Sequence, residues 1–242
     1  MCSRYELSTT NSEAVSLRFE LTSAPDLAPI PEVRPTNLVP VIKSSGMMEL
    51  LRWGLDHAWD NKPLINARSE TLMEKKTFIP LLENRCLVPA TAYFEWRKNG
   101  HKKLKNRISI LNQYNESLLF AFAGLFVDEY FTIITCPPTK SISHIHNRMP
   151  VILDAKREAL WINTKNTFES VSKILVPYQT NRLISGGAIL VNSAGNDHAI
   201  MSSHIDYTTM KNSIENEYLN GKVTNYRYRS ASFCNITPKT VN

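Results

Sequence analysis

The fold is decided by residues 85–100, which read Arg85-Cys86-Leu87-Val88-Pro89-Ala90-Thr91-Ala92-Tyr93-Phe94-Glu95-Trp96-Arg97-Lys98-Asn99-Gly100. The opening run, residues 85–89, is short and apolar, which is typical of a buried strand. Over residues 91–98 the side chains alternate between two faces, so a second strand carries Glu95 in its middle. The dipeptide Asn99-Gly100 is the strongest short signal for a hairpin, and it predicts a return strand over residues 101–111.

Further strand signals lie on both sides of this hairpin. Residues 39–42 and 47–53 read as a hairpin pair, and the apolar runs 118–127 and 130–136 are expected to pair antiparallel. Residues 16–21 also alternate and could be a strand. Helices are expected at about residues 69–76, 155–163 and 167–176. Many strands in hairpins with few helices predict an α+β fold. We expect a β-rich core of antiparallel sheets forming a partly barrel-like body, with flanking helices.

Length and composition set the class of protein. The 242 residues suit a domain over residues 1–200, followed by a C-terminal extension over residues 201–242 that is partly helical or disordered. The four cysteines have no paired short spacing, so neither a zinc ribbon nor a disulfide framework is predicted. No signal peptide and no apolar run of about 18 residues is recognisable, which predicts a cytoplasmic protein without a membrane partner. The net charge of +6 suits nucleic acid or another anionic surface.

The chain begins Met1-Cys2, and Cys2 is a candidate nucleophile. If Met1 is removed, Cys2 carries an α-amine and a thiol on adjacent carbons, with ordinary pKa values of about 8 and about 8.5. Such a 1,2-aminothiol captures aldehydes: the amine forms an imine, and the thiol closes a five-membered thiazolidine ring. The alternative is that Cys2 is an arbitrary residue of a frayed terminus.

Other candidates also have two readings. A carboxylate in mid-strand, as at Glu95, lies either on a solvated face or in a cleft. Trp53 suits the core or a stacking platform, Asn66 suits a helix cap or a polar site, and Arg68 suits a solvated charge. His144 and His146 are two apart and share one side of an extended chain, but no third ligand has a matching spacing. No metal and no cofactor are therefore predicted.

Several segments, in order, resemble the motifs of one family, the SOS-response-associated peptidase (SRAP) family, whose members crosslink to abasic sites in DNA. The start Met1-Cys2-Ser3-Arg4 resembles the family's Met-Cys-Gly-Arg start. The other matching segments are Arg52-Trp53-Gly54-Leu55, Ile65-Asn66-Ala67-Arg68-Ser69-Glu70-Thr71, Arg85-Cys86-Leu87-Val88-Pro89-Ala90, Tyr93-Phe94-Glu95-Trp96 and His146-Asn147-Arg148-Met149-Pro150-Val151-Ile152-Leu153. The resemblance covers about residues 1–200.

The sequence departs from the family pattern at four places. Ser3 stands where the family has glycine, which puts the geometry behind the nucleophile in doubt. His57 replaces a common proline, and Asn147 replaces the usual aspartate. Lys76 stands where some members have an arginine, which keeps the charge and loses the bidentate fork.

The resemblance implies a covalent sensor and shield of abasic sites in single-stranded DNA, with an associated autopeptidase and lyase-type chemistry. It assigns the catalytic work to Cys2, to Glu95 as general acid and base, to His146 as a proton-transfer group, and to Asn66 as a positioning group. It implies DNA contacts by the residues Arg4, Trp53, Arg68, Lys76, Arg85 and Arg148. A monomer, associated with the nucleoid when bound to DNA, is expected.

Two other functions remain open from the sequence. One is an N-terminal-cysteine peptidase that acts on protein substrates, with a site made of Cys2, Glu95 and His146. The basic charge and the aromatic residues also suit a noncatalytic single-stranded-DNA-binding protein. A peptidase would cleave an unrelated peptide, and a noncatalytic binder would show salt-dependent affinity without a covalent product.

Overall fold

The structure is a computed structural model that describes residues 2–9, 11–23, 26–43, 46–56, 62–111 and 117–178, together with the backbone of residues 188–193. The predicted C-terminal extension, residues 201–242, and His57 lie outside the described residues. The helices are α1 (Ser12–Phe19), α2 (Ala155–Ile162) and α3 (Phe168–Val171), with 3-10 turns η1 (Ser69–Thr71), η2 (Ile79–Leu81) and η3 (Ser172–Ile174). In the described part of the chain no helix is long and apolar enough to cross a membrane.

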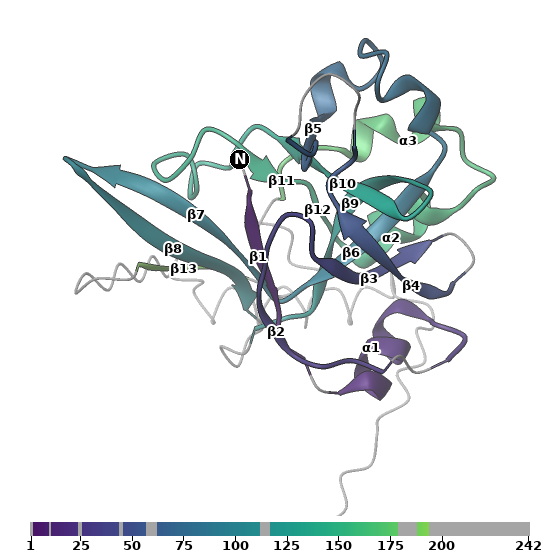
Figure 1. Ribbon diagram of the computed structural model, residues 1–242, viewed down its shortest axis with the longest axis horizontal. Coiled ribbons are helices and arrows are strands. Elements are labelled where there is room, and N and C mark those ends of the chain that lie inside the picture. Colours follow the sequence, from purple (N-terminus) through teal and green to yellow (C-terminus); the bar gives the residue numbers. More distant parts are fainter. Residues whose placement is uncertain are drawn as a thin grey trace, which may run out of the picture. The chain divides into compact units, whose positions relative to one another are not determined.

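Thirteen strands are described, and they make the larger part of the fold (Figure 1). In chain order they are β1 (Arg4–Leu7), β2 (Ile30–Val33), β3 (Leu38–Lys43), β4 (Met48–Trp53), β5 (Asn66–Arg68), β6 (Arg85–Ala90), β7 (Ala92–Asn99), β8 (Lys102–Leu111), β9 (Phe120–Val127), β10 (Tyr130–Cys136), β11 (Met149–Pro150), β12 (Ile152–Leu153) and β13 (Ala188–Ser193).

Five of these strands close into a barrel. The order runs β10-β4-β3-β6-β9, and β9 pairs back onto β10, so the ring has no open edge. The pairings are antiparallel except that β10 runs parallel to β4 and to β5. The predicted α+β fold with a partly barrel-like β core is therefore confirmed, with two parallel pairings that the prediction of antiparallel sheets did not include.

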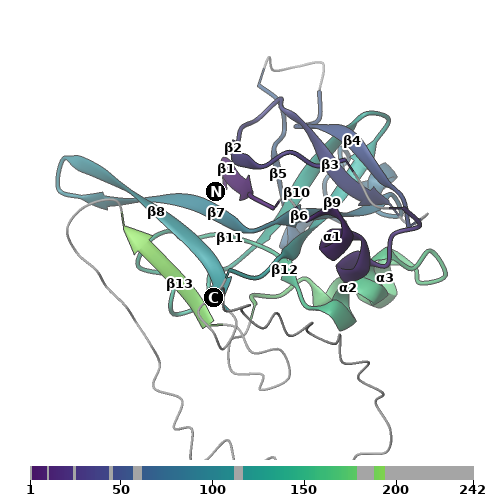
Figure 2. The same ribbon diagram turned by 90° about the horizontal axis from the view of Figure 1, so that it is seen from below.

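The second sheet has the order β13-β8-β7-β1-β2. It is joined to the barrel where the chain passes directly from β6 of the barrel into β7 (Figure 2). Thr91 is the single residue between β6 and β7. Its N–H donates to the carbonyl of Glu6 at 2.7 Å, and its Oγ1 accepts from the N–H of Ser8 at 3.0 Å. The chain can leave the barrel here because the carbonyl of Glu6 in β1 accepts the hydrogen bond of the Thr91 N–H, which would otherwise be buried without a partner.

The segment β11-Val151-β12 wedges between β9 and β10 where these two strands separate. The N–H of Val151 donates to Ile134 of β10 at 2.8 Å, and its carbonyl accepts from Ala123 of β9 at 2.9 Å. Val151 is fully buried. This insertion fixes the loop over residues 139–147, which leads into β11.

Two predicted elements are wrong. Residues 16–21 lie mainly in α1, because the Asn11 side chain caps this helix by accepting from the N–H of Ala14 at 2.8 Å. Residues 69–76 form η1 and separate turns instead of one helix. Leu72 alone among these eight described residues is buried, so no apolar stripe holds a helix against the core. The helix after Asp154 is confirmed as α2, and its Trp161 is fully buried.

Gly124 of β9 gives a test of the barrel packing. It lies between Cys86 of β6 and Ile133 of β10, and a Cβ added there would approach Cys86 Sγ to 2.8 Å. We expect Gly124→Ala to lower the free energy of unfolding by about 1–3 kcal/mol, as overpacking does. Urea denaturation measures the change.

The control is Gly100→Asn in the turn after β7. Gly100 has φ +58°, which Asn tolerates, and no atom lies within 4 Å of an added Cβ. We expect a change within about 0.5 kcal/mol there. Equal losses in the two variants would contradict the close packing of β9.

Candidate functional site

The position of the N-terminus is set by the pairing of β1 with β7. Arg4 lies opposite Phe94, and Tyr5 lies opposite Tyr93. Continuing this register places Ser3 and Cys2 beside Glu95 and the residue after it. Tyr5 anchors the strand, because its ring is fully buried and packs edge-to-face on Trp53, with ring centroids 5.2 Å apart.

Cys2 is fully buried at the end of this strand. Its Sγ donates to the carbonyl of Arg4 at 3.3 Å. Burial raises the pKa of the Cys2 thiol, and the nearby Glu95 carboxylate raises it further. The thiol is therefore protonated at neutral pH, and it reacts only where a neighbouring group takes its proton.

Asn66 holds the backbone of Cys2 from the other side. It begins β5, which runs parallel to β10, and its Nδ2 donates to the carbonyl oxygen of Cys2 at 2.8 Å. The Oδ1 of Asn66 is buried and has no hydrogen-bond partner among the described residues. A buried amide oxygen without a partner carries a desolvation cost, and it offers an acceptor to a bound hydroxyl or amine. The helix-cap reading of Asn66 is wrong, because Asn66 lies in a strand.

Glu95 lies in the middle of β7 with 2% of its surface exposed. The reading of a solvated face is wrong, because the first four residues of β7 are buried on both faces. Burial raises the pKa of the Glu95 carboxyl to about 7. Both protonation states are thus populated near neutral pH, which is the condition for a group that accepts and returns protons.

His146 lies in the loop before β11 and is half-buried. Its Nδ1 accepts from the N–H of Arg148 at 3.0 Å. Burial lowers the pKa of the imidazole, so the neutral ring predominates and carries its proton on Nε2. Among the described residues no group of three or more His, Cys, Asp or Glu side chains could hold a metal ion.

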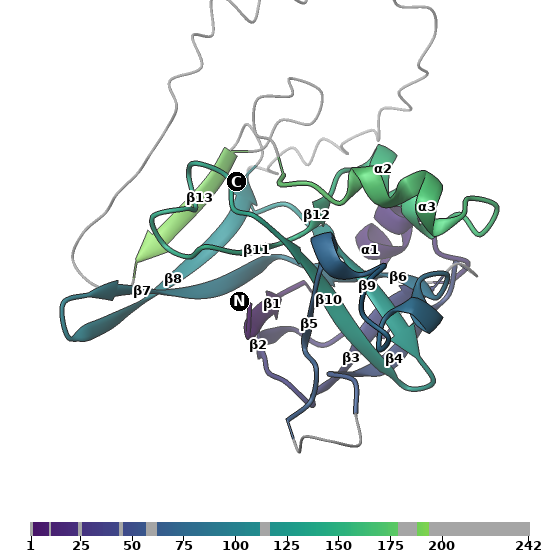
Figure 3. The ribbon, with the colours of Figure 1, turned by 90° about the horizontal axis from the view of Figure 1, so that it is seen from above.

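These groups meet at a cleft of about 730 Å³. The end of β1 lies beside β7 at its base (Figure 3). The loop over residues 139–147 and the β7–β8 hairpin form its sides, and the lining residues are Ser3, Arg4, Glu95, Trp96, Arg97, Lys98, Lys103, His144, Ile145, His146 and Asn147. The structure thus brings Glu95 and His146 to one cleft, and Cys2, which Asn66 holds, is buried next to the lining residue Ser3.

The family model described as SOS response associated peptidase (SRAP) matches residues 1–186 of the chain. The chain belongs to this family. It is 34% identical to the abasic site processing protein YoaM of Bacillus subtilis, over 82% of this chain and 96% of the relative. It is 37% identical to the abasic site processing protein YoqW of the same organism, over 69% of this chain and 83% of that relative.

Solved structures agree with this assignment. The SRAP chain superposes on the crystal structure of a protein from Bacteroides thetaiotaomicron with a TM-score of 0.65 and 27% identity. The match covers 78% of this chain and 91% of that chain. The fold described above is therefore also found in a protein of known structure.

Three of the six residues expected to contact DNA are structural in this SRAP chain. Trp53 has no exposed surface, and its Nε1 donates to the carbonyl of Ile65 at 2.9 Å, so stacking on a base is excluded. Arg85 is 3% exposed and donates to three carbonyls at the end of α2 and beyond, those of Trp161, Asn163 and Asn166. The predicted DNA contacts of Trp53 and Arg85 are wrong, because both side chains belong to the core.

Arg148 is also committed to the protein. It makes a bidentate ion pair with Glu70, at 2.5 and 2.9 Å, and donates to the carbonyl of Thr135 at 2.6 Å. Its side chain is 12% exposed. This arginine ties the loop before β11 to η1, and its Nε has no hydrogen-bond partner among the described residues, so its predicted contact with a phosphate stays a prediction.

The other three cations are accessible. Arg68 and Lys76 are exposed, and Arg4 lines the cleft with its Nε 3.4 Å from Glu32. The sequence reasoning missed the cations of the β7–β8 hairpin, Arg97, Lys98 and Lys103, which also line the cleft. The signal was present in the run of basic residues around Asn99-Gly100, but it reads equally as a solvated hairpin end.

The raised pKa of Glu95 predicts a pH-dependent stability. A Glu with an ordinary pKa of 4.5 in the unfolded chain and a pKa of about 7 in the folded chain binds more protons when folded. Stability therefore falls as pH rises from about 4.5 through 7, by up to about 3 kcal/mol. We expect Glu95→Gln to raise the melting temperature relative to the wild type more at pH 8 than at pH 5.

Glu32→Gln is the matched control for this measurement. Its hydrogen bond and ion pair with Lys105 lower the pKa of Glu32, so this carboxylate is ionised at both pH values. The difference between this variant and the wild type should be the same at pH 5 and pH 8. If Glu95→Gln behaves as this control does, Glu95 is not a buried carboxyl with a raised pKa.

Proposed function

We propose that this protein senses and shields abasic sites in single-stranded DNA by forming a covalent crosslink through Cys2. The substrate is the ring-opened abasic sugar, whose C1′ is an aldehyde. The single observation that carries the proposal is the hydrogen bond of 2.8 Å from Asn66 Nδ2 to the Cys2 carbonyl, beside Glu95. It fixes the residue whose amine becomes free when Met1 is removed.

The reaction balances without an oxidant or a metal. The Cys2 α-amine adds to C1′, water leaves, and an imine forms. The thiol then adds across the C=N bond, its proton passes to the nitrogen, and a thiazolidine ring results. The sum is aldehyde plus aminothiol giving ring plus one water.

Glu95 suits the proton transfers in both steps. Its carboxyl, with a pKa of about 7, can accept a proton from the amine, return one to the departing water, and accept the proton of the buried thiol. His146 lies on the same cleft with Nε2 as a donor, where it can donate a hydrogen bond to the ring oxygen of the closed sugar and so favour the aldehyde. Asn66 Oδ1 can accept from a hydroxyl of the sugar.

The names of the relatives support the same substrate, since YoaM and YoqW are called abasic site processing proteins. The same groups suit autoproteolytic removal of a short N-terminal extension and lyase-type reversal of the crosslink. We further propose a cytoplasmic monomer that associates with the nucleoid when DNA is bound.

The site suits a peptidase of other proteins less well. A cysteine peptidase needs a thiolate paired with an imidazolium. Here burial raises the pKa of the Cys2 thiol and lowers the pKa of His146. The imidazole Nδ1 is also occupied by the N–H of Arg148. A noncatalytic binder would not need a carboxyl buried at a cost in stability.

The test is incubation with a single-stranded oligonucleotide that carries one abasic site. Intact mass first establishes that Met1 is absent. We expect a heat-stable adduct with the summed mass of protein and DNA less one water. Cys2→Ala should form no such adduct, and Cys2→Ser should give only an imine that borohydride traps, because it lacks the thiol.

Glu95→Gln should slow adduct formation by roughly 10²- to 10⁴-fold, the usual contribution of a general acid and base. Glu32→Gln, which removes a carboxylate near the hairpin but outside the reaction, should retain the rate within a few-fold. The proposal is overturned if a wild type with a free Cys2 gives no adduct, or if Cys2→Ala gives the same ring-type adduct. Cleavage of an unrelated peptide would favour the peptidase.

A further inference from the structure

The β7–β8 hairpin carries basic side chains in two different situations. Nearer the barrel they are neutralised: Lys105 pairs with Glu32 and lies over the ring of Phe94 at 4.1 Å, and Arg107 makes a bidentate pair with Glu6 at 2.7 and 2.8 Å. At the cleft, no ion pair is recorded within the described part of the chain for Arg97, Lys98 or Lys103.

Lys98 and Lys103 are direct cross-strand partners. Both are exposed and both line the cleft. Two like charges placed opposite each other in an antiparallel pair destabilise it. Their repulsion falls when an anion lies near both ammonium groups.

Arg97 is a third cation, on the other face of β7, the face that carries Glu95, because side chains alternate along a strand. It lines the same cleft, and its Nε is buried without a hydrogen-bond partner among the described residues. A buried guanidinium donor left unpaired is unfavourable, and a phosphate oxygen is the acceptor that it matches best. The hairpin therefore presents both uncompensated charge and an unused donor to the cleft.

We infer that Lys98 and Lys103 bind a backbone phosphate of the DNA strand that flanks the abasic nucleotide, and that Arg97, on the face of β7 that carries Glu95, contacts a second phosphate of that strand. The inference rests on the proposed function for the identity of the strand. Lys98 is three residues from Glu95 along β7, about 10 Å. The phosphate bound there is therefore a neighbour of the reacting sugar, and the contact orients the strand without touching the aldehyde.

The test measures noncovalent affinity as a function of salt. The probe is a fluorescent single-stranded oligonucleotide carrying a tetrahydrofuran abasic analogue, which has no aldehyde and cannot crosslink. Each phosphate contact contributes about 0.7 to the slope of log K against log salt concentration. We expect the double variant Lys98→Gln/Lys103→Gln to lose about 0.7–1.4 of this slope and to bind more weakly at low salt.

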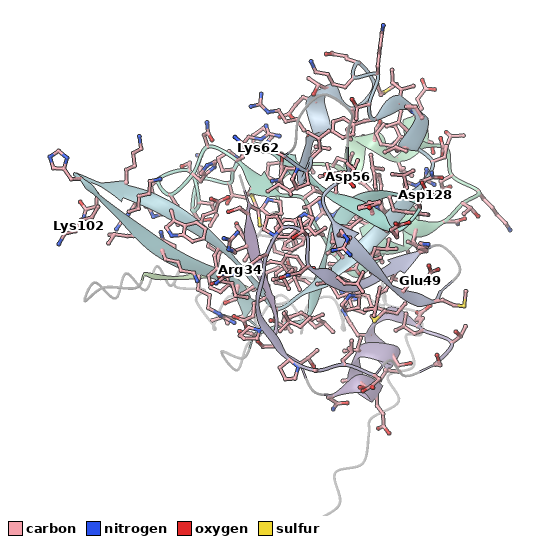
Figure 4. The ribbon with its side chains drawn as sticks, viewed as in Figure 1. Arg34, Glu49, Asp56, Lys62, Lys102 and Asp128 are labelled. Carbon is pink, nitrogen blue, oxygen red and sulfur yellow. The ribbon has the colours of Figure 1, made fainter. Side chains whose placement is uncertain are left out.

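The matched control is Lys102→Gln/Lys156→Gln, which removes the same charge from exposed positions that do not line the cleft. Figure 4 shows Lys102 at the far end of the hairpin. This control should keep the slope within about 0.3 of the wild type. An equal loss in both double variants would show general attraction only and would overturn the site, as would no loss in either.

A charge-reversal variant separates loss of the binding site from loss of the fold. Lys103→Glu places opposite charges across the strands, so we expect an unchanged or higher melting temperature together with weaker binding. Weaker binding with a lower melting temperature, and with no change in slope for the glutamine pair, would indicate misfolding and overturn the site.

The proposed chemistry is judged separately with glycolaldehyde, a small aldehyde that carries no phosphate. The wild type and Lys98→Gln/Lys103→Gln should gain the same mass at Cys2. If the wild type gains none, the aldehyde chemistry fails while the salt slopes still judge the phosphate site. If both gain the mass and the slopes agree, the phosphate site fails and the chemistry stands.

Discussion

The site depends on one pairing, that of β1 with β7. Three residues of β1, Arg4, Tyr5 and Glu6, pair with β7 and hold the chain in register beside Glu95, and the ring of Tyr5 packs against Trp53 and Phe122. Without this ladder, Cys2 would belong to a frayed terminus, where its amine and thiol would meet an aldehyde only by chance. The barrel positions the site through β1, because barrel residues form the packed surface that holds this strand in place.

Several unfavourable groups collect around the same cleft. Glu95 is buried with a raised pKa, Asn66 leaves a buried oxygen without a described partner, and Lys98 faces Lys103. Two buried charges away from the cleft are matched instead: Arg85 donates to three carbonyls, and Glu158 is paired with Arg18 at 2.7 Å. A buried carboxyl with a raised pKa beside a cleft, held there at a cost in stability, is typical of a functional site.

The sequence predicts local features well and long-range burial poorly. The strands over residues 85–100 and the hairpin at Asn99-Gly100 follow from alternation and turn chemistry, and the structure confirms them. No spacing reveals that Asn66 reaches the carbonyl of Cys2, 64 residues away, so only the family resemblance indicated it. Trp53 and Arg85 were misassigned for the converse reason: an indole and a guanidinium suit DNA, but their partners, Ile65 and Trp161, are known only once the chain is folded.

The protonation states around Cys2 bear on which reaction the site can perform. A thiol with a raised pKa is a poor first nucleophile, since only its thiolate attacks. An amine needs only to lose one proton, and Glu95, with a pKa of about 7, can accept it. In the proposed reaction the amine therefore adds first and the thiol second, because burial raises the pKa of the Cys2 thiol. In this order one carboxyl can serve both steps. Glu95 takes a proton from the amine and gives it to the departing water, so it is ionised again when it must take the proton of the thiol.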